Sequence, residues 1–74
     1  MKLTDKELLT QLAKRVKQLR KDKGVTQQEA FNDCNIHFGR IEQGIRDISF
    51  TTLYKLCNYF QIELNEFFTE DFRC

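Results

Sequence analysis

Residues 26–44 read TQQEAFNDCNIHFGRIEQG. Thr26 is a typical helix N-cap, because its hydroxyl can accept a hydrogen bond from a free N–H group of the first helical turn. The apolar positions that follow recur at the spacing of one helix face: Ala30, Phe31 and Cys34. The stretch therefore predicts a short helix that begins after Thr26.

A turn and a second short helix complete this stretch. Asn35 and Ile36 indicate the turn, and we expect the helix from about residue 37 or 38 to Gln43, before Gly44. Two short helices joined by a turn of about three residues have the shape of a helix-turn-helix motif. We place this motif at about residues 26–44.

The sequence before the motif predicts one long helix. Thr4 and Glu7 fit a capping box, in which each side chain bonds the other residue's backbone N–H, and Gly24 is a typical helix end. Between them the apolar side chains recur at steps of four, four and three: Leu8, Leu12, Val16 and Leu19.

Two further helices are expected after the motif. Ser49 should cap a helix over residues 50–60, and a short last helix should cover residues 64–69. Their inward faces are predicted to be formed by Phe50, Leu53, Leu56, Cys57 and Phe60, and by Leu64, Phe67 and Phe68. We expect the tail after residue 69 to fray, unless Phe72 holds it against the domain. The chain thus reads as one compact all-α domain of five helices over residues 1–74.

Composition and charge narrow the class of protein. The 74 residues are enough for one domain, and the net charge is only +1. Basic residues concentrate in positions 14–23, whereas the charged residues at positions 61–74 are mostly acidic. A net charge near zero can therefore conceal a basic face.

The three cysteines, Cys34, Cys57 and Cys74, are widely spaced and form no CxxC pair. This pattern does not indicate a zinc site or a disulfide framework. We interpret Cys34 and Cys57 as small core residues and Cys74 as exposed, with a redox switch through Cys74 as the alternative.

Nothing in the sequence indicates an enzyme, a cofactor or a membrane protein. Paired carboxylates in a plausible cleft, metal-ligand spacing and a phosphate-binding glycine loop are all absent. No apolar run approaches the ~20 residues that span a bilayer, and the start lacks a signal-peptide core. We expect a cytoplasmic, non-catalytic protein without cofactors.

Four segments of the chain, taken in order, resemble the lambda-repressor/Cro-like (XRE-type) family of helix-turn-helix regulators. The resemblance covers about residues 12–68, and no single segment is specific by itself. The segments are VKQLR at 16–20 with GVTQ at 24–27, RIEQG at 40–44, ISFTTL at 48–53 and QIELNEFF at 61–68.

The resemblance implies a five-helix domain that binds specific sequences of duplex DNA, commonly as a homodimer on a palindromic site. It implies that Arg20 pairs with Glu42 and so ties the first helix to the end of the third. It also implies that Gln27 and Gln28 meet DNA and that the third helix lies in the major groove.

The chain departs from the family at the start of the third helix. Fifteen steps separate Gln27 from Glu42. The usual family spacing is about three residues longer, which is almost one helical turn of about 3.6 residues. The missing positions normally project toward base edges, so the departure bears on base recognition more than on the fold.

The residues expected to contact DNA come from the motif and from its flanks. They are Arg15, Thr26, Gln27, Gln28, Asn35, His37, Phe38, Gly39, Arg40, Gln43 and Arg46. Helix-start N–H groups bind phosphate, glutamine can bond adenine, and arginine can bond guanine or phosphate. For most of these side chains the alternative is an ordinary solvated surface, and for Arg15 that alternative weighs equally. Gly39 fits either a close approach of DNA or close packing against the preceding helix.

The aromatic side chains near the end of the chain are more numerous than one small core needs. Part of this cluster is expected to form the homodimer interface, through Tyr59, Phe67 and Phe68. The alternative is a monomer core that uses large side chains.

The alternative function is that of a protein-interaction module. The shortened third helix and the surplus of aromatic residues would then serve a protein partner, as in an antitoxin, and DNA binding would be weak.

Overall fold

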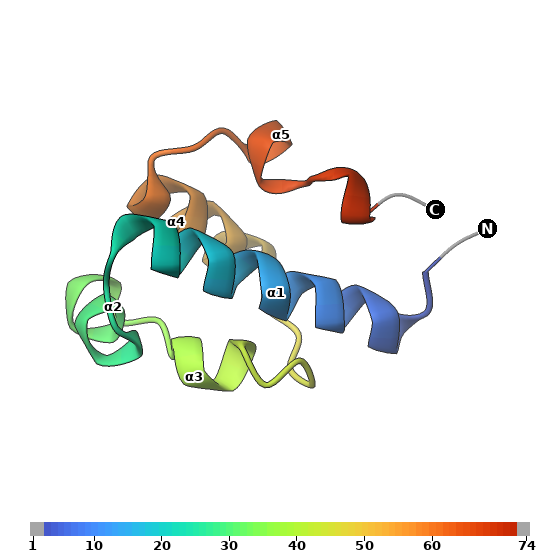
Figure 1. Cartoon of the computed structure of the whole chain (residues 1–74), viewed down its shortest axis with the longest axis horizontal. Coiled ribbons are helices and arrows are strands. Elements are labelled where there is room, and N and C mark those ends of the chain that lie inside the picture. The colour runs from blue at the N-terminus through green and yellow to red at the C-terminus, as the bar shows by residue number, and fades with distance from the viewer. Residues whose placement is uncertain (1–2, 73–74) are drawn as a thin grey trace.

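A long helix, α1, runs through the middle of the molecule in the computed structural model, which describes residues 3–72 (Figure 1). The remaining helices pack around it, with α2 and α3 on one side and α4 and α5 on the other. The elements are α1 Asp5–Lys23, α2 Gln27–Cys34, α3 Phe38–Ile41, α4 Phe50–Phe60, α5 Leu64–Phe67 and a final 3-10 turn, η1 Glu70–Phe72. The predicted all-α class with five helices is confirmed, and residues 3–72 contain no strand.

The helices begin where the sequence predicts, because local capping groups fix their starts. Thr4 and Glu7 form the expected capping box of α1, and Thr26 forms a second one with Glu29 at α2. The Ser49 hydroxyl accepts a hydrogen bond from the Thr52 N–H at the start of α4. Each cap satisfies backbone groups that a helix end otherwise leaves free.

Three helices end in the left-handed backbone region. Gly24 ends α1 with φ of 79°, a conformation that glycine adopts without steric cost. Asn35 ends α2 and Gln61 ends α4, both with positive φ, and asparagine is among the few non-glycine residues that adopt it readily. The chain therefore reverses at once after α2, which leaves only Asn35, Ile36 and His37 between α2 and α3.

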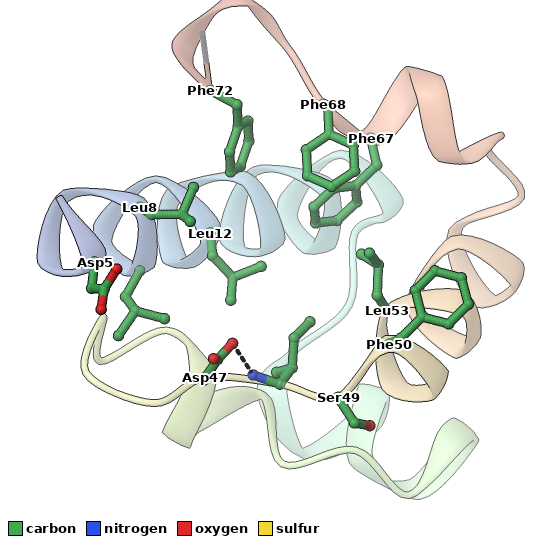
Figure 2. Close-up of a pocket in the computed structure, with 12 residues that line it drawn as sticks. Asp5, Leu8, Leu12, Asp47, Ser49, Phe50, Leu53, Phe67, Phe68 and Phe72 are labelled. Atoms are coloured by element: carbon green, nitrogen blue, oxygen red, sulfur yellow. Dashed lines mark hydrogen bonds between the residues drawn. The ribbon is translucent and has the colours of Figure 1, made fainter. Parts of the chain in front are cut away.

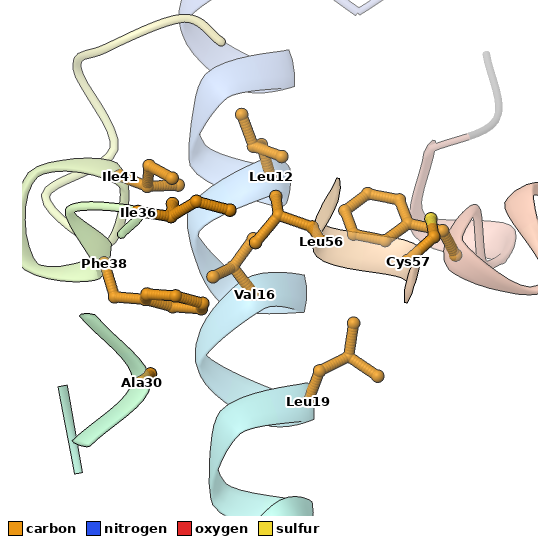
Figure 3. Close-up of a cluster of buried hydrophobic side chains, with 10 residues drawn as sticks. Leu12, Val16, Leu19, Ala30, Ile36, Phe38, Ile41, Leu56 and Cys57 are labelled. Atoms are coloured by element: carbon orange, nitrogen blue, oxygen red, sulfur yellow. The ribbon is translucent and has the colours of Figure 1, made fainter. Parts of the chain in front are cut away.

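The core lies along α1, whose apolar face meets both sides of the domain. Leu12, Val16 and Leu19 of α1 are buried, and Val16 has no exposed surface. Figure 3 shows Ile36, Phe38 and Ile41 packed on one side of α1 and Leu56 and Cys57 on the other. One helix thus connects the helix-turn-helix unit to α4 and α5.

Several residues predicted to face inward are exposed. Leu8, Phe50 and Phe68 keep 44%, 71% and 49% of their surface exposed. Phe50 stands at the first position of α4, and Phe68 follows the last residue of α5, so neither is enclosed by its own helix. Helical spacing alone cannot show where a packed face ends.

The two shortest helices are shorter than expected. The third ends at Ile41 instead of Gln43, and the fifth ends at Phe67 instead of Thr69. Gly44 adopts φ of 79° in the turn after α3. The tail is folded through residue 72, because the Phe72 ring packs against Phe67 and Phe68 at centroid distances of 6.1 and 5.2 Å.

The cysteines behave as the sequence suggests where they can be described. Cys57 is buried in the core and Cys34 is half-buried beside it. Burial raises the pKa of both thiols, which keeps them protonated and poorly reactive. Cys74, the expected exposed cysteine, lies outside the described residues. No helix within residues 3–72 has the length and apolar character that crossing a membrane requires.

An ion pair joins α1 to the end of α3. The Arg20 guanidinium donates to both carboxylate oxygens of Glu42, at 2.8 and 2.9 Å, and donates a third bond to the Val25 carbonyl oxygen. The two side chains are only 12% and 5% exposed. The pair that the family resemblance implied is therefore present, and its geometry is the bidentate one that strengthens arginine–carboxylate pairs.

Replacing Glu42 by alanine should destabilise the fold, because the Arg20 charge would remain largely buried without its partner. We expect Glu42→Ala to lower the free energy of unfolding by about 3 kcal/mol, the lower end for breaking buried pairs. Urea unfolding measures this loss. The exposed Glu70 provides a control, since Glu70→Ala should change stability by less than about 0.5 kcal/mol. Equal, small losses for both variants would show that the ion pair is not needed for the fold.

Candidate nucleic-acid interface

The start of α2 and the first three residues of α3 line one shallow hollow on the surface, in which polar and apolar groups are mixed. Amide and cationic side chains supply much of its lining, with an aromatic ring and a histidine beside them. The lining residues are Gln27, Gln28, Phe31, His37, Phe38, Gly39, Arg40 and Gln43. Seven of these eight positions were predicted from the sequence, and Phe31 was instead expected to face the core.

The packing of α2 against α3 explains the glycine in so short a helix. A Cβ atom on Gly39 would lie 3.2 Å from the side-chain oxygen of Gln27. The Gln27 amide nitrogen in turn donates to Glu42 at 3.2 Å. Of the two explanations of Gly39, this contact favours close packing against α2, since a Cβ atom there would require the Gln27 side chain to shift.

A second hollow lies beside the first and shares His37 and Arg40 with it. It extends from the turn before α3 to the first turns of α4. Three cations line it, Arg40, Arg46 and Lys55, together with the hydroxyl groups of Ser49 and Thr52. The one carboxylate in its lining, Asp47, accepts a hydrogen bond from the adjacent Ile48 N–H at 2.8 Å.

The second hollow contains site residues that the sequence did not reveal. Lys55 and Thr52 were read only as part of a helix, and Ser49 only as its cap. The available signal was helical spacing: Thr52 and Lys55 are three residues apart and so lie on one face of α4. That this face meets Arg40 and Arg46 depends on how α4 packs, which the sequence does not show.

Two predicted DNA-contact residues have structural roles instead. Arg15 donates from Nε to the Phe67 carbonyl oxygen and from its terminal nitrogen to that of Glu66, both at 2.7 Å. Its guanidinium carbon also lies 5.9 Å from the centroid of the Phe67 ring. Arg15 thereby holds α5 against α1. Phe38 is 1% exposed, so its side chain belongs to the core and cannot reach a ligand.

The other predicted contacts lie on or beside the two hollows. Asn35 and Arg46 line the second hollow. Thr26 is exposed but lines neither hollow. Its hydroxyl accepts a hydrogen bond from the Glu29 N–H in the cap of α2. The Gln28 amide nitrogen donates to Asn32 within α2, at 3.0 Å.

The predicted dimer residues are divided between core and surface. Phe67 has no exposed surface, so it cannot contact a second copy, and that expectation is wrong. Tyr59 is half-buried, donates its hydroxyl to Asp33 at 2.6 Å and has the Lys23 ammonium 4.8 Å from its ring centroid. Only Phe68 keeps about half its surface exposed.

An apolar hollow of about 350 Å³ lies on another part of the surface, between the start of α1, the start of α4 and the chain end. Figure 2 shows Leu8 and Leu12 of α1 on one side, Phe50 and Leu53 of α4 on the other, and aromatic rings from the last residues above them. Asp47, Ile48 and Ser49 line both this hollow and the cationic one. The two surfaces therefore meet along a single loop.

Comparison with protein families, with curated proteins and with solved structures finds no match to this chain. Across residues 3–72, no three histidine, cysteine, aspartate or glutamate side chains converge as metal ligands would.

The environment of Tyr59 predicts a measurable titration. Burial, the hydrogen bond to Asp33 and the charge of that carboxylate raise the pKa of Tyr59 from its usual 10 to about 12. In a Tyr54→Phe background Tyr59 is the only tyrosine, and its absorbance near 295 nm should report this pKa. Asp33→Asn should shift the titration back toward 10.

Stability should follow the same titration. Between pH 10 and 12 the unfolded chain loses the Tyr59 proton while the folded chain keeps it, so the free energy of unfolding falls as the pH rises. Tyr59→Phe should remove this part of the decline. A folded protein whose Tyr59 ionises near pH 10 would contradict the packing described here.

Proposed function

We propose that this chain is a cytoplasmic transcriptional regulator, of bacterial or phage type, that binds specific sequences of duplex DNA as a homodimer and catalyses no reaction. The observation that carries the proposal is the continuous surface formed by the two hollows that share His37 and Arg40, which bring amide, cationic and hydroxyl side chains together. Side chains able to bond base edges occupy one hollow, and cations and hydroxyl groups occupy the other.

The chemistry of this surface suits duplex DNA. Gln27, Gln28 and Gln43 carry amides that can donate to and accept from adenine, and Arg40 can bond guanine or a phosphate. Arg46 and Lys55 supply positive charge beside them, which favours phosphate contact without reading sequence. The near-neutral net charge of the chain is compatible with this local excess of cations.

The four-residue α3 limits how the surface enters the major groove. It presents about one turn, so few of its own side chains can reach base edges. The proposal therefore assigns base contacts jointly to the start of α2 and to α3, and phosphate contacts to the loop 45–48 and the start of α4.

The apolar hollow supports the homodimer. Exposed apolar side chains rim it, and patches of this kind mark interaction sites more often than random surface. Phe50 stands at the edge of the hollow with 71% of its surface exposed, so the ring of one copy can fill the hollow of the other in a two-fold arrangement. Because this surface meets the cationic one at residues 47–49, such a pair would place the cationic hollow of each copy beside the dimer interface.

The same apolar rim supports a second candidate function. A protein partner with an amphipathic segment would cover Leu8, Phe50 and Phe68 equally well, as in an antitoxin. In that case DNA binding would be weak and the partner complex tight.

DNA binding is tested by fluorescence anisotropy with a duplex selected by this protein from a random pool, against a scrambled duplex of the same length. We expect tight binding to the selected duplex, far weaker binding to the scrambled one, and a steep decline of affinity with salt. Arg46→Ala and Lys55→Ala should weaken binding to both duplexes and lower the salt slope by about 1 each. Lys6→Ala, an exposed lysine that lines neither hollow, is the control.

Arg40→Ala separates base from phosphate contact at the junction of the hollows. A loss of about 1–3 kcal/mol confined to the selected duplex would identify a base contact, and an equal loss on both would identify a phosphate contact. Equal, weak and salt-insensitive binding to both duplexes by the unmodified chain would overturn the proposal and favour the interaction module.

The homodimer is tested by Phe50→Asp. Aspartate is well tolerated in the first turn of a helix, so α4 should still form, while each copy would now place an unpaired carboxylate in the apolar hollow of the other. Sedimentation should show a dimer for the unmodified chain and a monomer for the variant. Ile45 is 73% exposed but does not line the hollow, so Ile45→Asp should leave the dimer intact. A variant that dimerises as the unmodified chain does would place the interface elsewhere.

A further inference from the structure

The hollow between α2 and α3 contains two rings among its amide side chains, those of Phe31 and the exposed His37, to which the proposed function gives no role. Phe31 and His37 stack there with ring centroids 4.6 Å apart and planes 31° from parallel. Phe31 is only half-buried, and the residues around the two rings carry amides and a guanidinium: Gln27, Gln28, Gln43 and Arg40.

The shortness of α3 is what leaves these rings open. Asn35 ends α2 in the left-handed conformation, and α3 begins after only two more residues. The position on α3 that packs against Gln27 is Gly39, which has no side chain to extend over the hollow. A longer helix would have placed further side chains on this face.

We propose that the Phe31–His37 pair holds the C5-methyl group of a thymine in the major groove, while a glutamine amide at its rim reads the paired adenine. This inference rests on the proposed DNA binding and names the base pair that the hollow selects. The methyl group of thymine is the one apolar group that the four bases present in the major groove, so it is the group that the surface of these two rings can recognise by apolar contact.

The amide side chains around the two rings favour the same T·A base pair. A glutamine amide can donate to adenine N7 and accept from its N6 amino group, so two rings beside amides fit a T·A pair. Cytosine offers an amino donor that a carboxylate accepts best, and none of the residues lining this hollow is a carboxylate. Guanine would be served by Arg40, which lines the cationic hollow as well as this one and is also available to phosphate.

The experiment removes single methyl groups from bound DNA. In the duplex selected by the protein, each thymine is replaced in turn by deoxyuridine, which lacks only the methyl group. We expect one position in each half-site to lose affinity by about fourfold, because the modified duplex no longer buries one methyl group against the protein. The remaining thymines serve as matched controls and should tolerate the change.

A second substitution checks that the methyl group itself is read. Cytosine at the sensitive position should weaken binding more than uracil, and 5-methylcytosine should recover about fourfold of that loss. Cytosine carries an amino group where thymine has its carbonyl oxygen O4. A recovery with 5-methylcytosine would therefore show that the protein recognises the methyl group and not that oxygen.

Variants of Phe31 assign the effect to this hollow. Phe31→Leu keeps an apolar side chain and should retain most of the difference between thymine and uracil, whereas Phe31→Ser should abolish it. For each variant we compare its affinity for the thymine duplex with its affinity for the uracil duplex. A general loss of affinity or stability lowers both values equally and leaves their ratio unchanged.

The outcomes separate this inference from the function on which it rests. Specific DNA binding that is insensitive to every uracil substitution, or a methyl effect unchanged in Phe31→Ser, would overturn the methyl contact and leave DNA binding standing. Absence of specific binding to any selected duplex would overturn both.

Discussion

The ion pair between Arg20 and Glu42 is the constraint on which the rest of the structure depends. One guanidinium bonds both oxygens of Glu42 and the carbonyl oxygen of Val25, so it fixes the end of α1, the chain before α2 and the turn after α3 at once. Glu42 also accepts from Gln27, which ties the start of α2 to the same point. A helix of four residues has almost no stability alone, and here its position is fixed by its neighbours.

A second arginine holds α5 against α1, as Arg20 holds the end of α3. Arg15 bonds two carbonyl oxygens at the end of α5 and lies against the Phe67 ring, which is fully buried. Both arginines project from α1, so this one helix supplies the core face and the polar ties on either side of it. The short helices α3 and α5 are therefore held in place by contacts with α1.

The arrangement also separates the two surfaces that the proposed function needs. The polar hollows lie over α2, α3 and the start of α4, and the apolar hollow lies between the starts of α1 and α4 and the chain end. They meet only at the loop 47–49, where Asp47 bonds its own neighbour. A second copy seated on the apolar hollow would thus leave the polar surface open to DNA.

The sequence by itself determined the class of the fold and the starts of its helices, because Thr4, Thr26 and Ser49 act on backbone groups only a few residues away. It also led to the Arg20–Glu42 pair, through the resemblance of its motifs to a known family. Tertiary structure alone decided the roles of Arg15, Phe67 and Phe68, since a side chain's exposure depends on contacts with residues distant along the chain. For the same reason only the fold brought Lys55 to Arg40 and Arg46, and left the ring of Phe31 open beside His37.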